Sequence, residues 1–233
     1  MRKLIHLCYR RPDITHAEYA ERVLGGHVPL ALRHHPTMRR YVVNIVSQEL
    51  VPGPREVDAI PELSFATLGD YRERLYDSPE GQAIIARDVA RFLDGASAYE
   101  CTEHVRKDSA PEARVERPVP PASPSVKLYL CLKRRPDLSH DAFVTYWLER
   151  HAPLVLEHGA RLSKYVQNVV DGKLSTDGED YDGFAELHFA SEADFAAQMA
   201  GHGQASNPVQ EDTAQFIAGM AVYRVAEHVA RVA

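Results

Sequence analysis

The chain has 233 residues, of which 45% are hydrophobic, 26% charged and 8% aromatic, and its formal net charge is −6. Such fractions are typical of a soluble globular protein with one large or two small domains. No run of 18 apolar residues is present, and the N-terminal segment has neither the apolar length nor the cleavage site of a signal peptide. Basic residues do not cluster, so we expect neither nucleic acid nor a membrane surface as a partner.

Cysteine usage favours the cytoplasm. The three cysteines, Cys8, Cys101 and Cys131, are odd in number, far apart and free of any CxxC spacing. Disulfide frameworks and zinc knuckles need paired or closely spaced cysteines. We therefore expect a cytoplasmic protein with reduced thiols.

The sequence contains an internal duplication with a constant offset of 124 positions. Arg11-Pro12-Asp13 recurs as Arg135-Pro136-Asp137, and the same offset still relates residues 103–105 to residues 227–229. About 30 of roughly 105 aligned pairs are identical without a gap, which is typical of a tandem repeat.

A proline-rich segment separates the two copies and contains Pro111, Pro118, Pro120, Pro121 and Pro124. Such a segment cannot bury a core and predicts a semi-rigid tether, able to reach roughly 60 Å at about 3.1 Å per residue. We therefore divide the chain into a first repeat at 1–107, a linker at 108–125 and a second repeat at 126–233.

The second copy carries the local patterns of four strands and two helical regions. Ser139 is the expected N-cap of the first helix, and Thr15 forms a capping box with Glu18 at the same place in the first copy. The order is β-α-β-β-α-β, a ferredoxin-like unit. Hydrophobic spacing places the strands at 126–133, 164–170, 183–189 and 221–229, the first helix after Ser139 and the second from residue 192.

One such unit covers a single face of its sheet with helices and leaves the other face bare. The second copy is the obvious partner for that face. We therefore predict an α+β fold in which two ferredoxin-like repeats pair within one chain as a closed barrel. This intrachain pseudo-dimer leaves a further homodimer open.

Three segments of the second copy, at 133–154, 165–168 and 181–189, carry a family resemblance. They resemble the EthD family of dimeric α+β barrel proteins, so the chain looks like a tandem EthD fusion. The resemblance implies a small cofactor-free protein of aromatic or polyketide metabolism, such as a decarboxylase or dehydratase of polyketide acids. Related barrels include isomerases, anthrone-type oxygenases and haem-binding proteins.

The first copy departs from this pattern and is expected to be a weakened or purely structural half. Val23 stands where the second copy has Trp147, and Ser64 stands where it has His188. Gly25-Gly26 also replaces Glu149-Arg150.

His151 is the leading catalytic candidate. Phe143, Trp147 and His151 follow each other at intervals of four and share the sheet-facing side of a helix. Burial keeps an imidazole neutral, which suits a general base near pH 7. Pro153 removes a helical hydrogen bond and predicts a distortion at this point. A core histidine bonded to a backbone carbonyl is the alternative, and His27 before Pro29 repeats the arrangement in the first copy.

Polar residues of the third strand are further candidates. Asp182, Phe184, Glu186 and His188 alternate and therefore share one face. If this face looks toward the helices, Asp182 orients His151 and His188 enters the same cleft. If it looks into the barrel, these residues are polar groups of the interface. We favour the cleft.

Trp147 and Phe143 are expected to form an apolar wall for a substrate. Tyr165 is a candidate donor to an enolate oxygen, with core packing as its alternative. Asn168 lies three positions away on the same strand and therefore faces the opposite side. His158, about 10.5 Å along the helix from His151, is a candidate substrate contact but lies too far away to share a metal with it.

The sequence contains no GxGxxG, P-loop or GxSxG motif and no metal-ligand spacing. We therefore expect no cofactor and no metal. The leading hypothesis is an enzyme of lyase or cyclase type that decarboxylates, dehydrates or cyclises a small aromatic or polyketide-like substrate by acid-base chemistry. A cofactor-free anthrone-type oxygenase and a non-catalytic ligand- or haem-binding barrel are the alternatives.

Overall fold

The computed structural model describes residues 1–111, 113–202 and 207–233. In repeat 1, two strands flank a first helical region, which a short π-helix interrupts, and the second helical region precedes the last strand. The elements are β1 (Arg2–Arg10), α1 (His16–Glu21), the π-helix η1 (Arg22–His27), α2 (Val28–His34), β2 (Arg40–Val51), β3 (Ala59–Phe65), α3 (Leu68–Arg72), α4 (Pro79–Val89) and β4 (Leu93–Asp108).

Repeat 2 follows the same order after the short strand β5 (Val115–Glu116). Both repeats therefore have the predicted β-α-β-β-α-β arrangement. The elements are β6 (Val126–Arg134), α5 (His140–Tyr146), the π-helix η2 (Trp147–His151), α6 (Ala152–His158), β7 (Leu162–Lys173), β8 (Gly183–Phe189), α7 (Glu192–His202), α8 (Pro208–Thr213) and β9 (Ile217–Val232).

The predicted helix starts and the predicted distortion are confirmed. Thr15 and Glu18 form a capping box, and the Ser139 hydroxyl accepts a hydrogen bond from the backbone N–H of Ala142. The distortion before Pro153 is the π-helix η2, in which the N–H of Ala152 bonds to the carbonyl of Trp147 five residues earlier.

Eight antiparallel strands of the described chain close into a barrel in the order β2-β3-β1-β4-β7-β8-β6-β9. Each repeat contributes four of them. The last strand of each repeat pairs with the other repeat, β4 with β7 and β9 with β2, and the second pairing closes the barrel. The predicted intrachain pairing of two ferredoxin-like units is therefore confirmed.

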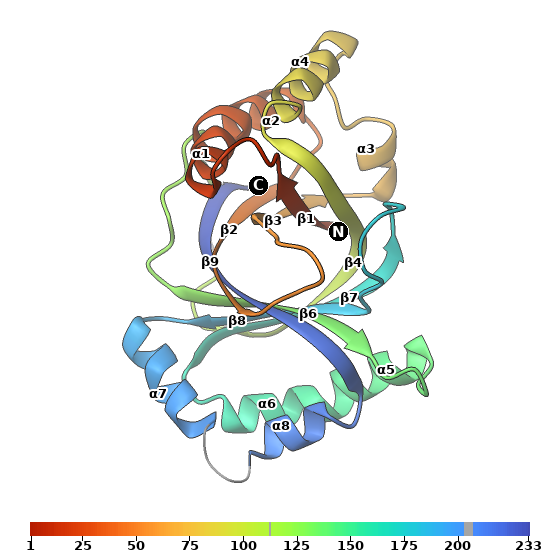
Figure 1. Cartoon of the computed structure of the whole chain (residues 1–233), viewed down its shortest axis with the longest axis vertical. Coiled ribbons are helices and arrows are strands. Elements are labelled where there is room, and N and C mark those ends of the chain that lie inside the picture. Colours follow the sequence, from red (N-terminus) through yellow and green to blue (C-terminus); the bar gives the residue numbers. More distant parts are fainter. Residues whose placement is uncertain (112, 203–206) are drawn as a thin grey trace.

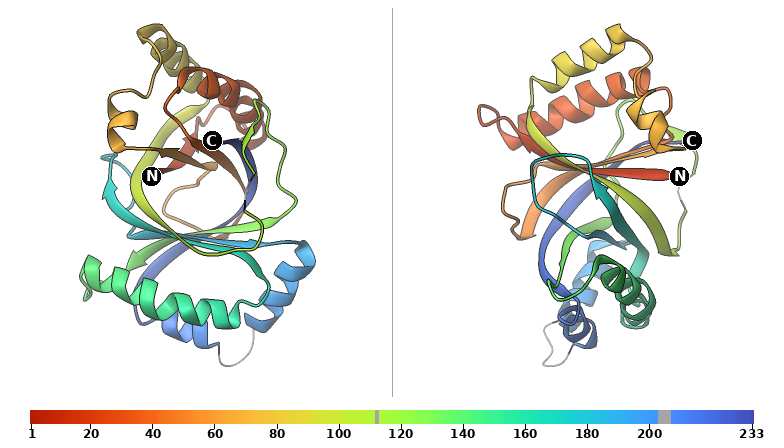
Figure 2. Two further views of the ribbon diagram at one scale, coloured as in Figure 1. Left: turned by 180° about the vertical axis from the view of Figure 1, so that it is seen from behind. Right: turned by 90° about the vertical axis from the view of Figure 1, so that its right-hand side faces the viewer.

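The helices cover the barrel on two opposite sides. In Figure 1, α1–α4 of repeat 1 lie above the strands and α5–α8 of repeat 2 lie below, and the two views of Figure 2 show the same arrangement. Each sheet half packs its outer face on its own helices, which gives two separate apolar cores outside the barrel and a third inside it. Among the described residues, no helix is long and apolar enough to span a membrane.

The segment between the repeats runs along β9. β5 pairs with the end of that strand, and the N–H of Arg117 donates to the carbonyl of Ala230. Further along, the N–H of Ser123 donates to the carbonyl of Glu227. These backbone bonds tie the linker to the barrel instead of leaving it a free tether.

Candidate active site

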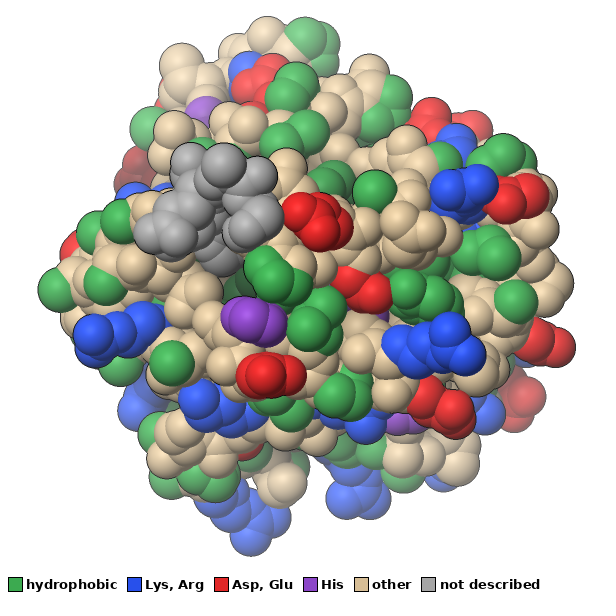
Figure 3. Space-filling model, turned by 90° about the horizontal axis from the view of Figure 1, so that it is seen from below, with side chains coloured by type: hydrophobic (Ala, Val, Ile, Leu, Met, Phe, Trp, Pro, Cys, Tyr) green, Lys and Arg blue, Asp and Glu red, His purple; other side chains and the backbone are tan. Residues whose placement is uncertain are grey.

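A cavity of about 640 Å³ lies between the helices of repeat 2 and the outer face of its sheet. Its floor consists of apolar side chains from β6, β8 and β9, including Leu130, Leu187 and Val222. Among the described residues, no Asp, Glu, Lys or Arg lines it. Figure 3 shows this side of the molecule, where hydrophobic side chains reach the surface between charged ones. The cavity therefore suits an uncharged, largely apolar ligand.

His151 lies in the wall of this cavity and is bonded to a carboxylate. Its Nδ1 lies 2.7 Å from Oδ2 of Asp212, which belongs to α8. The hydroxyl of Tyr146 donates to the other oxygen of Asp212, also at 2.7 Å. A carboxylate acceptor assigns the proton to Nδ1 of the imidazole, which leaves Nε2 as the basic nitrogen.

The surroundings of His151 keep the imidazole neutral at pH 7. The residue is 7% exposed, and its ring centroid lies 4.9 Å from that of Phe216. Burial lowers the pKa of His151 below its usual value of 6.5, although the bond to Asp212 acts in the opposite direction. A neutral imidazole held by a carboxylate can accept a proton from a bound molecule.

Three of the predicted substrate-binding residues line the cavity beside His151. They are Trp147, Tyr165 and His158. The side chains of Trp147 and Tyr165 are both almost completely buried, so both rings are held in the wall. Phe143 lies behind this wall, with its ring centroid 5.4 Å from that of Trp147.

Asp182 is not beside His151, so the prediction that it orients this histidine is wrong. Its carboxylate accepts from the backbone N–H and the guanidinium of Arg134 at 2.9 and 3.0 Å, and it lies 3.3 Å from Nδ1 of His140. Asp58 makes the equivalent bonds to Arg10 and His16 in repeat 1. This pair of aspartates ties each first helix to its sheet.

The preference for placing the polar face of β8 in the cleft is also wrong. Glu186 and His188 lie inside the barrel, where Nε2 of His188 is 3.6 Å from Oε2 of Glu186. Asn168 lies there too and donates to Glu186 at 2.8 Å. Asn168 does face the side opposite to Tyr165, as its spacing predicts. None of these polar residues lines the cavity.

A family model and solved structures give the wider context of this site. The model of the EthD domain matches residues 11–96 and again residues 135–219. The chain belongs to the EthD domain family. The predicted tandem EthD organisation is therefore confirmed. Among proteins of curated function, none matches the chain in sequence.

The solved structures similar to this tandem EthD protein share its fold at low sequence identity. An anthrone oxidase-like protein has a TM-score of 0.64 at 11% identity, covering 98% of this chain and 92% of its own. A candidate monooxygenase from Lactobacillus acidophilus has a TM-score of 0.56 at 8% identity, covering 99% and 95%. A chlorite dismutase variant from Candidatus Nitrospira defluvii has a TM-score of 0.51 at 11% identity, covering 97% and 91%.

The first EthD repeat contains the same histidine–aspartate pair. Nδ1 of His27 lies 3.0 Å from Oδ2 of Asp88, and the His27 ring lies 5.4 Å from Phe92. Asp88 and Phe92 precede Asp212 and Phe216 by the repeat offset of 124. Asp212 is the functional candidate that the sequence reasoning missed, and the two identical pairs at this offset were the signal that could have found it.

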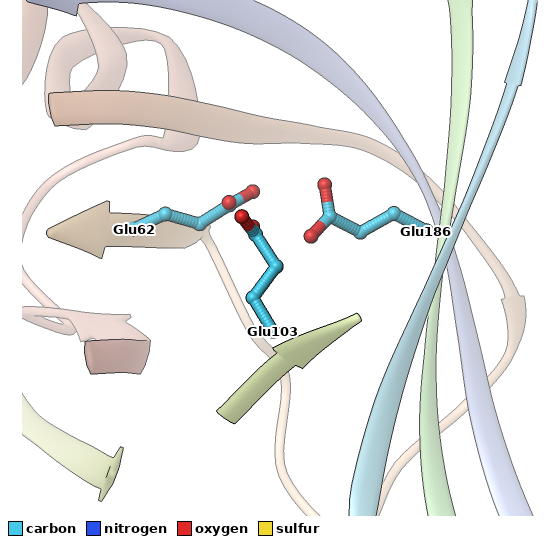
Figure 4. A group of neighbouring side chains, drawn as sticks. All are labelled: Glu62, Glu103 and Glu186. Atoms are coloured by element: carbon cyan, nitrogen blue, oxygen red, sulfur yellow. The ribbon is translucent and has the colours of Figure 1, made fainter. Parts of the chain in front are cut away.

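The centre of the barrel holds a second cluster of charged side chains. Figure 4 shows the carboxylates of Glu62, Glu103 and Glu186 converging from three strands. The ammonium of Lys3 bonds to all three carboxylates at 2.6–2.7 Å. Lys127, which belongs to repeat 2, bonds to Glu62 and Glu186, both at 2.8 Å. A lysine therefore already takes the place that a metal ion would need.

The two lysines keep Glu62 and Glu186 ionised. Burial and the neighbouring Glu186 oppose the ionisation of Glu62, but Lys127 and Lys3 outweigh them and lower the pKa of Glu62 to about 2. The pKa of Glu186 is likewise held well below its usual range. Burial opposes the charge on Lys127, yet its carboxylate partners raise its pKa well above the usual value. The cluster is an ion-pair network that joins the repeats.

Haem, which the ligand-binding alternative invokes, does not fit the lining of the cavity. Nε2 of His151 is an available nitrogen, but haem also carries two propionates, and such anions need a cationic partner when they are buried. Among the described lining residues there is no Lys or Arg to pair with them. Burying unpaired carboxylates is costly, so we derive no step through haem.

Proposed function

We propose that the chain is an enzyme that binds an uncharged aromatic or polyketide-like molecule in the cavity of repeat 2 and moves a proton with His151. The observation that carries this proposal is the His151–Asp212 pair in the wall of an apolar cavity without charged lining. A polar catalytic pair against an apolar pocket is a common arrangement for acid-base catalysis.

The chemistry that this arrangement supports begins at a carbon next to a carbonyl group. Nε2 of His151 takes a proton from that carbon, and an enol or enolate forms. Asp212 holds the imidazole in one tautomer and stabilises the imidazolium. The imidazolium then gives the proton back. In a dehydration it gives the proton to the departing hydroxyl group, which leaves as water. One positioned base contributes about 10²–10⁴-fold to such a reaction.

The neutral lining favours cyclisation or dehydration over decarboxylation of an ionised acid. A substrate carboxylate inside this cavity would lose its hydration without meeting a cationic side chain. That loss costs binding free energy. We therefore place the substrate among uncharged phenolic ketones.

An oxygenase is the second candidate, and the likeness to an anthrone oxidase-like protein is what favours it. The same proton transfer would convert an anthrone into its carbanion. The carbanion would add O₂, and the resulting hydroperoxide would lose water to give a quinone. This route uses His151 in the same role but requires O₂ as a second substrate.

One probe separates the two candidates. Anthrone is neutral and tricyclic, and its acidic C–H protons exchange with D₂O when a base acts on them. We expect the enzyme to accelerate this exchange under argon. If the enzyme also consumes O₂ in air and forms anthraquinone, it carries out the oxygenase step. If it does neither in air, its activity is limited to proton transfer.

His151→Ala is expected to lower the exchange rate by about 10²–10⁴-fold without unfolding the barrel. His27→Ala removes the equivalent imidazole of repeat 1 and is expected to cost less than about tenfold, since His27 does not line the cavity. Full exchange activity in His151→Ala would contradict the proposal.

The pH profile tests the pairing of His151 with Asp212. Because the pKa of His151 lies below 6.5, the exchange rate should stay level from pH 8 to pH 6.5 and fall only at lower pH. Asp212→Asn removes the carboxylate that raises this pKa, so the acidic limb should move to lower pH and the rate should drop. An unchanged profile in Asp212→Asn would show that Asp212 does not act on His151.

A further inference from the structure

A second cavity, of about 280 Å³, lies at one end of the barrel and is called the barrel-end cavity below. Its lining includes parts of two corresponding connections, residues 52–58 between β2 and β3 and residues 174–182 between β7 and β8. Tyr9, which also lines it, lies about 20 Å along β1 from Lys3 of the central ion-pair network. The barrel-end cavity shares no lining residue with the cavity of repeat 2. It is therefore a separate space.

In repeat 2 the connection is hydrogen-bonded to a tyrosine of the other repeat. The hydroxyl of Tyr99 donates to the carbonyl of Glu179 at 2.6 Å. Glu179 follows Gly178, whose φ of +89° lies in the left-handed region that favours glycine. A Cβ at this position would also overlap the side chain of Ser97. Gly178 therefore permits the turn that brings the Glu179 carbonyl to Tyr99.

Repeat 1 lacks the equivalent hydrogen bond. The three residues of the contact have counterparts at the repeat offset, which are Pro54 for Gly178, Arg55 for Glu179 and Tyr223 for Tyr99. The proline ring fixes φ near −65°, so Pro54 excludes the left-handed conformation of Gly178. The hydroxyl of Tyr223 is completely buried and donates no hydrogen bond to any described residue. Burial also raises the pKa of Tyr223, so this hydroxyl keeps its proton and remains a donor.

The side chains of repeat 1 leave space beside Tyr223. In repeat 2 the ring of Tyr181 packs against that of Tyr99, with the centroids 6.2 Å apart. Val57 stands at the corresponding position of repeat 1 and has no ring to pack against Tyr223. Both Val57 and Tyr223 line the barrel-end cavity. A buried donor without an acceptor costs stability, and a ligand that brings an acceptor would remove this cost.

The charged residues of the lining already have partners. Arg55 donates to Asp94 at 2.6 Å, and Lys133 donates to Glu179 at 2.9 Å. The guanidinium of Arg55 also lies over the ring of Tyr9, 3.9 Å from its centroid. A charged ligand would thus meet no unpaired opposite charge among the described lining residues. This favours an uncharged ligand.

The size and walls of the barrel-end cavity limit the ligand further. The rings of Tyr9 and Tyr181 line it together with Pro54, and flat side chains of this kind suit an aromatic ring. Its volume lies just below the usual range of ligand sites, about 300–1,000 Å³. A ligand of one or two rings is therefore expected.

We propose that the barrel-end cavity binds an uncharged aromatic molecule of one or two rings, whose oxygen accepts the hydrogen bond of Tyr223. At this hydroxyl the ligand takes the place that the Glu179 carbonyl takes at Tyr99. It would lie between the corresponding connections of both repeats. This proposal does not rest on the proposed function, because His151 and the residues around it do not line the barrel-end cavity.

Fluorine NMR of protein labelled with 3-fluorotyrosine tests the proposal, with the uncharged two-ring ketone 1-tetralone as the probe. The chain contains 11 tyrosines, and single Tyr→Phe variants assign their signals. Tyr181 lines the barrel-end cavity and Tyr165 lines the cavity of repeat 2, so the two signals show where the probe binds. We expect 1-tetralone to shift the Tyr181 signal saturably, with a Kd on the order of 1 mM or below.

Three variants locate the binding site by following the Tyr181 signal. Tyr223→Phe removes only the donor and should weaken binding of 1-tetralone by about 3- to 10-fold. Val57→Tyr introduces the residue of repeat 2, which should fill the space and abolish the shift. Tyr129→Phe is the matched control and should leave the Kd unchanged. The Tyr129 hydroxyl is also buried without a described partner, but Tyr129 does not line the barrel-end cavity.

Tyr223→Phe decides the question if Val57→Tyr does not fold, because it removes only a hydroxyl that has no acceptor. The same Kd in Tyr223→Phe and the wild type would overturn the proposal, and so would a saturable shift that persists in folded Val57→Tyr. A Tyr181 signal that does not move up to the solubility limit of 1-tetralone would also overturn it. Shifts confined to the Tyr165 signal would show that the probe enters only the cavity of repeat 2, which contradicts the proposal as well.

Discussion

The two EthD repeats share a histidine–aspartate pair but differ in the space beside it. In repeat 2, Leu130 and Gly159 line the cavity. The corresponding positions of repeat 1 carry His6 and His35. His35 is buried, and its Nδ1 lies 3.1 Å from the carbonyl of Leu75. Its ring packs at a tilt against that of Tyr76, with the centroids 5.2 Å apart. The histidine–aspartate pair is therefore common to both repeats. The repeats differ in the residues beside it, which line a cavity in repeat 2 and are bulkier in repeat 1.

The lysine–glutamate network at the centre of the barrel teaches the opposite lesson, since its residues are the same in both repeats. Lys3 and Lys127 occupy corresponding positions, as do Glu62 and Glu186, and each lysine bonds to both glutamates. An interface at which two copies meet constrains both in the same way. The outer faces carry no such constraint, and there the repeats have diverged.

The largest effect on stability is expected at this shared centre. Lys127→Met removes a completely buried ammonium and leaves Glu62 and Glu186 with one cation fewer. Removing one partner of a buried ion pair costs about 3–5 kcal/mol. Urea unfolding at pH 7 should show this loss, and Lys3→Met should show a loss of the same size.

Lys133→Met is the control for this comparison, because Lys133 pairs with Glu179 at the surface. An exposed pair contributes about 0–1 kcal/mol. If Lys3→Met and Lys127→Met differ strongly, or if neither costs more than the control, the centre is not an equivalent, stabilising network.

The fold could be predicted because its signals are local or repeated. Ser139 and Thr15 mark helix starts through their own side chains, and the offset of 124 identifies the partner that covers the second face of each sheet. His151 could be predicted from its spacing after Phe143 and Trp147, and Pro153 indicated the distortion. These inferences needed no knowledge of contacts between distant elements.

The partner of His151 could not be predicted in the same way. His151 and Asp212 lie 61 positions apart, and nothing local in the sequence joins them. The strand pattern shows that Asp182, Glu186 and His188 share a face, but alternation alone does not tell which face looks inward. Here the two buried lysines decide the question, because Glu186 must meet them inside the barrel.

A smaller effect is expected from the histidines that fill repeat 1. Burial lowers the pKa values of His6 and His35 to about 4, so the folded state favours their neutral forms. The unfolded chain takes up these protons below pH 6.5. Stability that is present above pH 6.5 is therefore lost as the pH falls toward 4, by about 3 kcal/mol at most for His6.

His6→Leu introduces the residue of repeat 2 and removes one of these titrations. Compared with the wild type, the variant should lose about 3 kcal/mol less between pH 6.5 and pH 4 in urea unfolding. Near pH 8 His6 is neutral in both the folded and the unfolded state. The difference in unfolding free energy between variant and wild type should therefore not change with pH there. Parallel stability curves from pH 8 to pH 4 would show that burial of His6 does not oppose its protonation.

The smallest effect on stability concerns the close contact between Gly183 and the indole of Trp147. A Cβ at Gly183 would lie 2.8 Å from Cη2 of Trp147 and closer still to Cζ3, so only glycine leaves room for the indole. Repeat 1 has Val23 and Ala59 at the two positions. Gly183→Ala should displace the ring and cost about 1–3 kcal/mol. In Trp147→Val the same substitution should cost nothing or stabilise the strand by about 0.5–1 kcal/mol. A double-mutant cycle measures this coupling, and an equal cost in both backgrounds would mean that the two positions diverged independently.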